Sequence, residues 1–321
     1  MSMLEQIEFR KQRDFGDVIN VTFQFLRQNF SLLSKSLLFI VGPVALLGGL
    51  SGVGYIDSLP TVLDDSEAVP DALSMGLFGL YYMLLIVMGL LASVLAVTVV
   101  SSFMFLYQAR GAGGFDFEDV WAKVKERLWD MAKTTMLAVV LYMSSFVFML
   151  APMMIIALST SSGAMMLAAV ATFIGIIICI AIFFYFVVVI ALLYPVRMFE
   201  SSSTGVTFSR SRFLLKDNYL NSFAVLIVSA ILMMILGMVF SAPNYAFAFV
   251  GGLHSLTDGE AGVVKYPLML LSVLGSIGSS LMYAVPVTAM NLQYFSLVEK
   301  KEQTGLMGRI DALDKQAGDG V

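Results

Sequence analysis

Residues 134–196 of this 321-residue chain contain no aspartate, glutamate, lysine or arginine. A helix of ~20 apolar residues crosses the hydrocarbon core of a bilayer, so this run is long enough for two crossings. Hydrophobic residues make up 59% of the chain and charged residues 13%, about half the charged share of a typical soluble domain. One soluble core could not bury so much apolar surface. The sequence therefore predicts an all-α, polytopic membrane protein.

Long charge-free runs predict six membrane-spanning helices. The run from 134 to 196 is divided by the serine-rich residues 159–163, which are typical of a turn. Each run is expected to be helical, because a segment in lipid must satisfy its backbone hydrogen bonds internally. The expected spans cover residues 36–56, 75–108, 134–158, 164–194, 221–242 and 266–298.

The basic residues are sorted to one side of the predicted membrane. Every lysine and arginine except Lys265 falls in the N-terminal segment, in the second or fourth connection between spans, or in the tail. Segments rich in Lys and Arg remain in the cytoplasm. An even number of spans places both termini on that same side. The two arguments agree on cytoplasmic N- and C-termini.

A unit made of one cytoplasmic amphipathic helix and one hairpin of two spans is predicted to occur three times. Residues 25–30 resemble residues 214–219, and residues 14–18 resemble residues 116–120. A proline also recurs in or just after the first span of each unit. The predicted organisation is three units, at 1–110, 111–200 and 201–299, followed by a cytoplasmic tail at 300–321.

The amphipathic helix predicted to begin near residue 117 contains both tryptophans of the chain. Its apolar residues recur at helical spacing, and charged residues fill the other face. Tryptophan favours the headgroup layer and basic side chains attract anionic lipid, so this helix is expected to lie along the membrane surface. Docking on the end of the bundle and a groove for a partner protein are the alternatives. The expected interface anchors are Trp121, Trp129, Lys123, Lys125 and Arg127.

The predicted spans contain no ionisable Asp, Glu, Lys, Arg or His. Ion-coupled transporters, proton relays and voltage sensors use such groups inside the membrane, so the sequence argues against those classes. Asn291 and Gln293 are expected to form hydrogen bonds between helices. Glycines and prolines predict close packing or kinks, with a broken helix lining a substrate site as the alternative. The positions concerned are Pro43, Gly48, Gly52, Pro152, Gly275 and Gly278.

No pattern in the sequence is typical of an enzyme or of a metal site. The single Cys179 excludes an intrachain disulfide, and the single His254 excludes a multi-histidine metal site. The acidic residues 64–67 lack the spacing of a calcium loop. No glycine-rich phosphate loop and no paired nucleophile and base are found. We expect no enzymatic activity and no cofactor, and the net charge of -4 predicts no nucleic-acid binding.

Three stretches carry a resemblance to known proteins: residues 13–30, the Gly42-Pro43 pair and residues 299–310. They resemble an uncharacterised group of membrane proteins from Bacteroidetes-like bacteria. They are also similar to the six-span membrane domain that accompanies some glycerophosphodiester phosphodiesterases. The resemblance implies a bacterial inner membrane. It implies no activity, because the phosphodiesterase domain has no counterpart in this chain.

Two functions remain for such a chain. The first is a non-enzymatic scaffold or accessory subunit of an inner-membrane complex, which contacts membrane lipids and other membrane or cytoplasmic proteins. The second is a transporter, channel or lipid-handling protein with an uncharged pathway. The sequence leaves the oligomeric state open.

Overall fold

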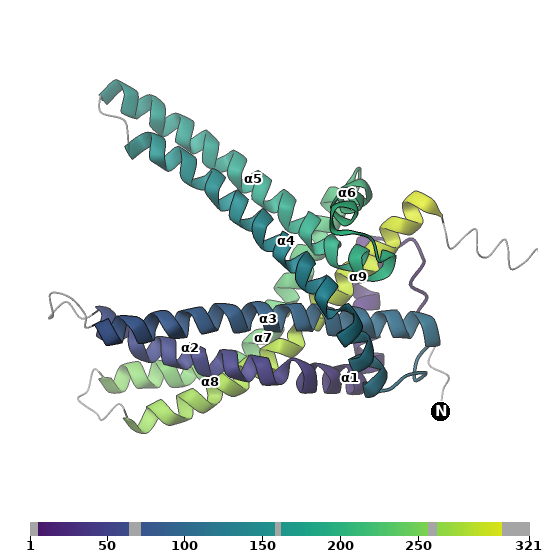
Figure 1. The fold of residues 1–321 in the computed structure, drawn as a ribbon, viewed down its shortest axis with the longest axis horizontal. Helices are drawn as coiled ribbons and strands as arrows, with labels where there is room; N and C mark the ends of the chain where they lie inside the picture. Colours follow the sequence, from purple (N-terminus) through teal and green to yellow (C-terminus); the bar gives the residue numbers. More distant parts are fainter. Residues whose placement is uncertain (1–5, 64–71, 158–161, 256–261, 304–321) are drawn as a thin grey trace, which may run out of the picture. The chain divides into compact units, whose positions relative to one another are not determined.

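The computed structural model describes residues 6–63, 72–157, 162–255 and 262–303, and its regular elements there are all α-helices (Figure 1). This confirms the predicted all-α class. The chain forms two compact units. Unit 1 comprises Met1–Ile7, Gly16–Leu128 and Ile227–Ala289; unit 2 comprises Glu8–Phe15, Trp129–Leu226 and Met290–Val321. The helices are α1 (Phe15–Ile40), α2 (Gly42–Leu63), α3 (Ala72–Arg110), α4 (Phe117–Ala157), α5 (Ser162–Glu200), α6 (Thr204–Leu215), α7 (Tyr219–Ser255), α8 (Gly262–Met282) and α9 (Ala284–Glu302).

Four helical stretches of the described chain are long and apolar enough to cross a membrane. The bent pair of α1 and α2 raises this number to five, so the protein is a multi-pass helical membrane protein. The third expected span, residues 134–158, is not among these stretches. It falls on α4, where the side chains from residue 145 onward lie outside the described residues. The four stretches are Ala72–Arg110, Thr172–Glu200, Tyr219–Ala242 and Val273–Glu302.

The break between α1 and α2 lies inside the first predicted span instead of before it. α1 continues to Ile40, α2 starts at Gly42, and the two helices meet at 54°. Pro43 explains the position of the break. Its ring has no N–H to donate and would clash with the carbonyl four residues earlier in a continuous helix. It is tolerated in the first turn of α2, where that N–H is not needed.

α4 combines a predicted surface helix and a predicted span in one uninterrupted helix of 41 residues. Its start is capped by Asp116 and Asp119, each of which accepts a hydrogen bond from the backbone N–H of the other, at 3.1 and 3.2 Å. This reciprocal pair satisfies donors that a helix start leaves open. No glycine or proline interrupts the chain between Phe117 and residue 151. Pro152 lies in the last turns of the helix, and its side chain is outside the described residues.

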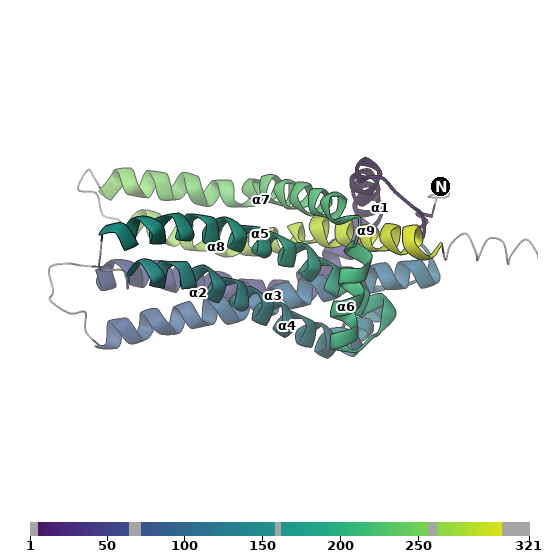
Figure 2. The same cartoon turned by 90° about the horizontal axis from the view of Figure 1, so that it is seen from above.

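In unit 1, glycines bring α2 close to α3 and α8, which lie alongside it in both ribbon views (Figure 1, Figure 2). A Cβ on Gly48 would lie 3.4 Å from Met88 Cβ of α3, and one on Gly52 would lie 3.5 Å from Leu85. Gly49 faces α8 at still shorter range. A Cβ there would lie 2.6 Å from Ser276 Oγ.

The α7–α8 contact also depends on small residues. A Cβ on Gly275 would lie 3.2 Å from the Phe240 carbonyl oxygen, and one on Gly278 would overlap the Phe240 ring. Small residues at helix contacts let backbones approach closely in a membrane, where apolar side chains gain little from leaving lipid. The predicted glycine positions are therefore helix contacts in this structure.

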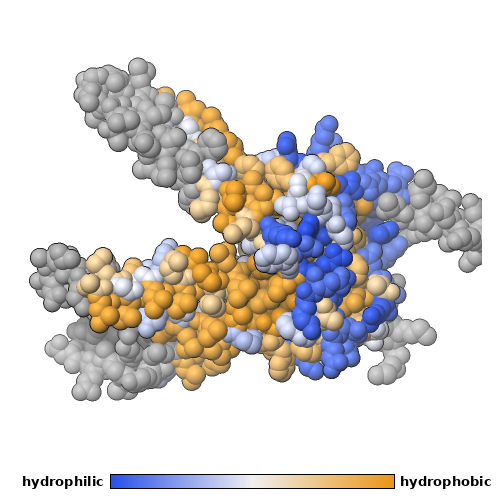
Figure 3. Space-filling model, in the orientation of Figure 1, coloured by the Kyte–Doolittle hydropathy of each residue, from blue (hydrophilic) through white to orange (hydrophobic). Residues whose placement is uncertain are grey.

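The long helices change character along their length. In α3 most of the large apolar side chains from Leu73 to Leu91 are exposed, whereas those from Val94 to Tyr107 are mostly buried. α5 shows the same change between Tyr185, which is exposed, and Val188, which is buried. Hydrophobic surface covers the exposed sections, and hydrophilic side chains gather near α6 and the start of α4 (Figure 3).

This pattern locates the lipid-exposed part of α5. The helix has 39 residues, roughly 58 Å at the rise of an α-helix, whereas the hydrocarbon core of a bilayer is ~30 Å thick. About half the length of α5 is therefore enough to cross the hydrocarbon core. The exposed apolar section of the described part of α5 ends at Tyr185.

A candidate binding site at the charged end of unit 2

α6 returns along α5 after the connection at residues 201–203. Phe208 of α6 packs against the cluster that contains Ile190 and Leu193 of α5. The side of α6 that is buried carries two hydroxyl residues, Thr207 and Ser211. Each donates to the carbonyl four residues earlier, at 2.9 Å, so its hydroxyl is satisfied without water. We call α6, the last turn of α5, the α6–α7 turn and residues 290–302 of α9 the charged end of unit 2.

Arg210 joins three helices of the charged end. Its guanidinium Nε lies 3.1 Å from both carboxylate oxygens of Glu200 in α5, and a second nitrogen contacts Glu302 in α9. Tyr294 donates to Glu200 at 2.9 Å. Burial alone lowers the pKa of Arg210, but the hydrogen bonds to Glu302 and Glu200 outweigh it and raise that pKa above its ordinary value. Arg210 is thus a permanent positive tie between α5, α6 and α9.

The turn between α6 and α7 is held by α9. Asp217 has a φ of 70°, a left-handed conformation that Asp tolerates better than most residues. Lys300 donates to Asn218 Oδ1 at 2.6 Å, and Lys301 lies 3.2 Å from Asp217 Oδ2. The backbone N–H of Asn218 also donates to Leu215 at 2.9 Å. Two cations from α9 therefore fix the conformation of this turn.

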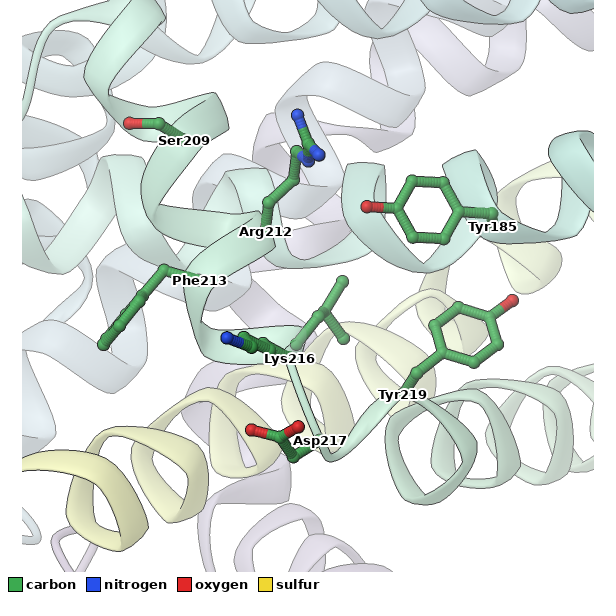
Figure 4. A pocket seen from close by; sticks show the side chains of 8 residues that line it. Tyr185, Ser209, Arg212, Phe213, Lys216, Asp217 and Tyr219 are labelled. Atoms are coloured by element: carbon green, nitrogen blue, oxygen red, sulfur yellow. The ribbon is translucent and has the colours of Figure 1, made fainter.

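A pocket of about 470 Å³ opens beside this turn. In the close-up, the Tyr185 hydroxyl points toward the Arg212 side chain, whereas the Lys216 amine and the Asp217 carboxylate both point away from these two groups (Figure 4). The rings of Tyr185 and Tyr219 stack with centroids 5.8 Å apart. The lining residues are Tyr185, Ser209, Arg212, Phe213, Leu215, Lys216, Asp217 and Tyr219.

The two cations of the pocket differ from the other cations of the charged end. Arg212 and Lys216 are exposed, and neither makes an ion pair within the described ranges. The guanidinium carbon of Arg212 lies 5.9 Å from the centroid of the Phe208 ring. By contrast, Arg197 pairs with Asp130 of α4 at 2.6 Å and is almost fully buried. The pocket therefore holds uncompensated positive charge beside hydroxyl groups.

The interface anchors expected from sequence divide into two groups on α4. Trp121 and Trp129 are 39% and 71% exposed, and a lysine four residues later, Lys125 or Lys133, lies 5.4 or 5.6 Å from each indole ring. Val120 and Val124 of the same helix are fully buried, so one side of this part of α4 packs against the protein.

Lys123 and Arg127 are mostly covered. The Lys123 ammonium lies 4.4 Å from the Phe105 ring and 3.0 Å from Glu126, and Arg127 lies 3.4 Å from Glu126. Their side chains are held by the protein itself, so they offer less to a surface than the exposed tryptophans do.

The two amides expected to join helices are both buried in α9. Gln293 Nε2 donates to Ser222 Oγ of α7 at 3.0 Å, so this side chain does bridge two helices of unit 2. Asn291 lies two residues earlier on the same helix. The side chain of His254, the acidic residues 64–67 and most of the tail, 304–321, lie outside the described residues.

Comparison with family models, with curated proteins and with solved structures gives no match. The bacterial resemblance noted above therefore stays a prediction.

Sequence reasoning missed the pocket. It used Arg212 and Lys216 only to orient the chain, and it placed Tyr185 inside a span. One signal was present, because the two cations are four residues apart in the sequence. The return of α6 along α5, which brings them to Tyr185, has no local signature.

Proposed function

We propose that this protein is a non-enzymatic scaffold of a bacterial cytoplasmic membrane that holds partner proteins at its cytoplasmic side. Its helices form six spans, with both termini in the cytoplasm. The sorting of the basic residues supports this orientation, and the lipid-exposed sections of α3 and α5 support one crossing of about 20–25 residues for each.

The observation that carries the proposal is the exposure of Trp121 and Trp129 outside the charge-free spans. Each indole lies near a lysine head, so the α4 surface combines apolar area with positive charge. Exposed tryptophans of this kind are enriched at protein interfaces and at membrane surfaces. The charged residues of unit 2 mostly pair with each other and tie helices together, which is a structural use.

Replacing both tryptophans tests whether a partner protein binds to this surface of α4. The tagged protein is extracted in a mild detergent and its complexes are measured by native mass spectrometry, with the Trp121→Ala/Trp129→Ala double variant beside it. Leu73→Ala/Met83→Ala is the matched control, since both side chains are exposed in the apolar section of α3. We expect wild type and control to carry the same partner in fixed ratio, and the tryptophan variant to lose it. A lone monomer in every mild extraction, or an unchanged complex in the tryptophan variant, contradicts the proposal.

The orientation has its own test. A reporter that is active only in the cytoplasm, fused after Val321, is expected to be active, and a reporter that needs the periplasm is expected to be silent. The opposite pair of results overturns the proposed topology and leaves the partner test unaffected.

The pocket favours a second candidate function, a lipid-handling protein, transporter or channel with an uncharged pathway. Flux of lipids or small solutes in liposomes that contain the purified protein decides it. Movement no faster than in protein-free liposomes excludes this candidate.

A further inference from the structure

We infer that the pocket at the α5–α6–α7 junction binds a phosphate group, and that the group belongs to the headgroup of an anionic phospholipid. This inference goes beyond the scaffold function and does not depend on it. It depends on the helices crossing a membrane and on the geometry of the pocket.

The charge of the pocket selects an anion. Arg212 and Lys216 bring two positive charges without an acidic partner in the described chain, while Asp217 is engaged by Lys301 at 3.2 Å. An arginine guanidinium matches phosphate oxygens with parallel N–H donors, and a lysine adds a point charge. The Tyr185 hydroxyl supplies a further donor in the lining, whereas the Ser209 hydroxyl already donates to the Val206 carbonyl at 3.0 Å. Phosphate is an anion that accepts from guanidinium, ammonium and hydroxyl donors alike.

The depth of the pocket selects a lipid. Tyr185 is the last exposed side chain before α5 becomes buried. Tyrosine is enriched in the headgroup layer, and this preference supports that level for the pocket. Leu220, one residue after the pocket-lining Tyr219, is 78% exposed and can contact an acyl chain below the headgroup. A volume of about 470 Å³ holds a phosphate with its glycerol; small-molecule sites in general measure about 300–1,000 Å³.

The pocket is also preformed. Arg210 fixes α6 to α5 and α9, and Lys300 and Lys301 fix the following turn. The ion pair of Arg210 and the turn held by Lys300 and Lys301 lie on either side of Arg212 and Lys216 in the chain. The backbone of these two residues is therefore already ordered before an anion binds, and binding loses little backbone entropy. Preorganisation of this kind favours tight binding.

The experiment uses the full chain in nanodiscs and the reactivity of the Lys216 amine toward an acylating reagent. The three lipid arms are phosphatidylcholine alone, phosphatidylcholine with phosphatidylglycerol, and phosphatidylcholine with a fatty acid at equal surface charge. A fourth arm adds inorganic phosphate to the first. We expect phosphatidylglycerol to slow acylation of Lys216 by about tenfold, with little effect of the fatty acid or of inorganic phosphate.

The comparison within the chain is Lys11, which is exposed near the N-terminus and does not line the pocket. Equal protection of Lys11 and Lys216, or protection by the fatty acid as strong as by phosphatidylglycerol, shows general attraction to a charged surface and overturns the inference. Protection by inorganic phosphate alone overturns the lipid source. No protection in any arm overturns the site.

A variant pair gives an independent readout. Arg212→Gln/Lys216→Gln and the matched Arg10→Gln/Lys11→Gln remove the same charge from exposed positions. Native mass spectrometry in detergent titrated with phosphatidylglycerol is expected to show about tenfold weaker binding of the first retained lipid for the pocket variant alone. Equal weakening in both variants contradicts the inference. Because the acylation assay needs no substitution, the site remains testable if the pocket variant does not fold.

Discussion

Ser296 of α9 makes two hydrogen bonds with the backbone of Arg13. Its hydroxyl oxygen accepts from the Arg13 N–H at 2.9 Å, and the hydroxyl donates to the Arg13 carbonyl at 3.0 Å. Both residues belong to unit 2 and are buried. Nearby, the Phe9 and Phe295 rings stack with centroids 5.4 Å apart. One hydroxyl thus fastens residues 8–15 to a helix near the other end of the chain.

Replacement of Ser296 by alanine is expected to release this segment. Both polar groups of Arg13 lose their partner, a cost of about 1–3 kcal/mol. Trypsin cleavage after Arg10 and Lys11 should then accelerate, as should hydrogen exchange of residues 8–15. Ser34→Ala is the control, because the half-buried Ser34 hydroxyl donates only to carbonyls of its own helix. Equal cleavage rates in the two variants contradict the tie.

Alanine at Gly49 is expected to destabilise unit 1. The new Cβ would lie 2.6 Å from Ser276 Oγ and 3.2 Å from Val273 Cα, so α2 and α8 must separate. Overpacking of this kind costs about 1–3 kcal/mol. Gly89→Ala has nothing within 4 Å and is expected to be neutral or up to ~1 kcal/mol stabilising. The midpoints of thermal unfolding in one detergent check the pair; similar midpoints for both variants refute the close contact.

Asp130→Asn is expected to leave Arg197 with a charge that nothing nearby balances. The Arg197 side chain is 9% exposed and its ion pair with Asp130 measures 2.6 Å. Loss of a charged hydrogen-bond partner costs about 1.5–3 kcal/mol. A double-mutant cycle with Arg197→Gln should show a coupling above ~1 kcal/mol. Glu126→Gln, in a pair that is largely exposed on the Glu126 side, should change stability by less than ~1 kcal/mol. Coupling near zero shows that the pair does not stabilise α4 on α5.

Acid is expected to loosen the turn before α4. The hydrogen bond from Arg110 holds the pKa of Asp119 below its ordinary value of 3.8. A carboxyl whose pKa is lowered in the folded state stabilises fully above the ordinary value and loses that contribution as the pH falls below it. Hydrogen exchange of residues 110–119, corrected for intrinsic rates, should therefore speed up below about pH 3.8.

Arg110→Gln is the control for this titration. It should shift the loss of protection to higher pH, toward the ordinary value of Asp119. An unchanged pH profile in the variant means that Arg110 is not the cause.

The sequence was sufficient for the helical class and for the glycine contacts, because both depend on patterns of local composition. A charge-free run such as 134–196 can only be helical in lipid, and Gly48 and Gly52 share one side of α2. The first span was predicted to start at residue 36, but the helix breaks at residue 41, five residues later. Hydropathy shows where the apolar residues begin, whereas Pro43 determines where the helix breaks.

The charged end could not be predicted, because its pairs join residues that are far apart in the chain. Glu302 meets Arg210, and Lys300 meets Asn218, only after α9 has packed beside α6. The periodicity of apolar residues carries no information about such long-range pairs. The sequence also did not predict that α4 is one continuous helix. Lys133 separates a polar from an apolar stretch, but a charged residue does not end a helix.

The change in α3 between Leu91 and Val94 has a consequence for where the protein can reside. We expect a bilayer that matches the exposed apolar section of α3, which ends at Leu91, to need no local thinning around the protein. Mismatch between a bilayer and an apolar section costs only fractions of a kcal/mol per Å, yet it sorts proteins between membranes of different thickness. The length of this exposed section is therefore expected to decide the bilayer thickness in which the protein is most stable.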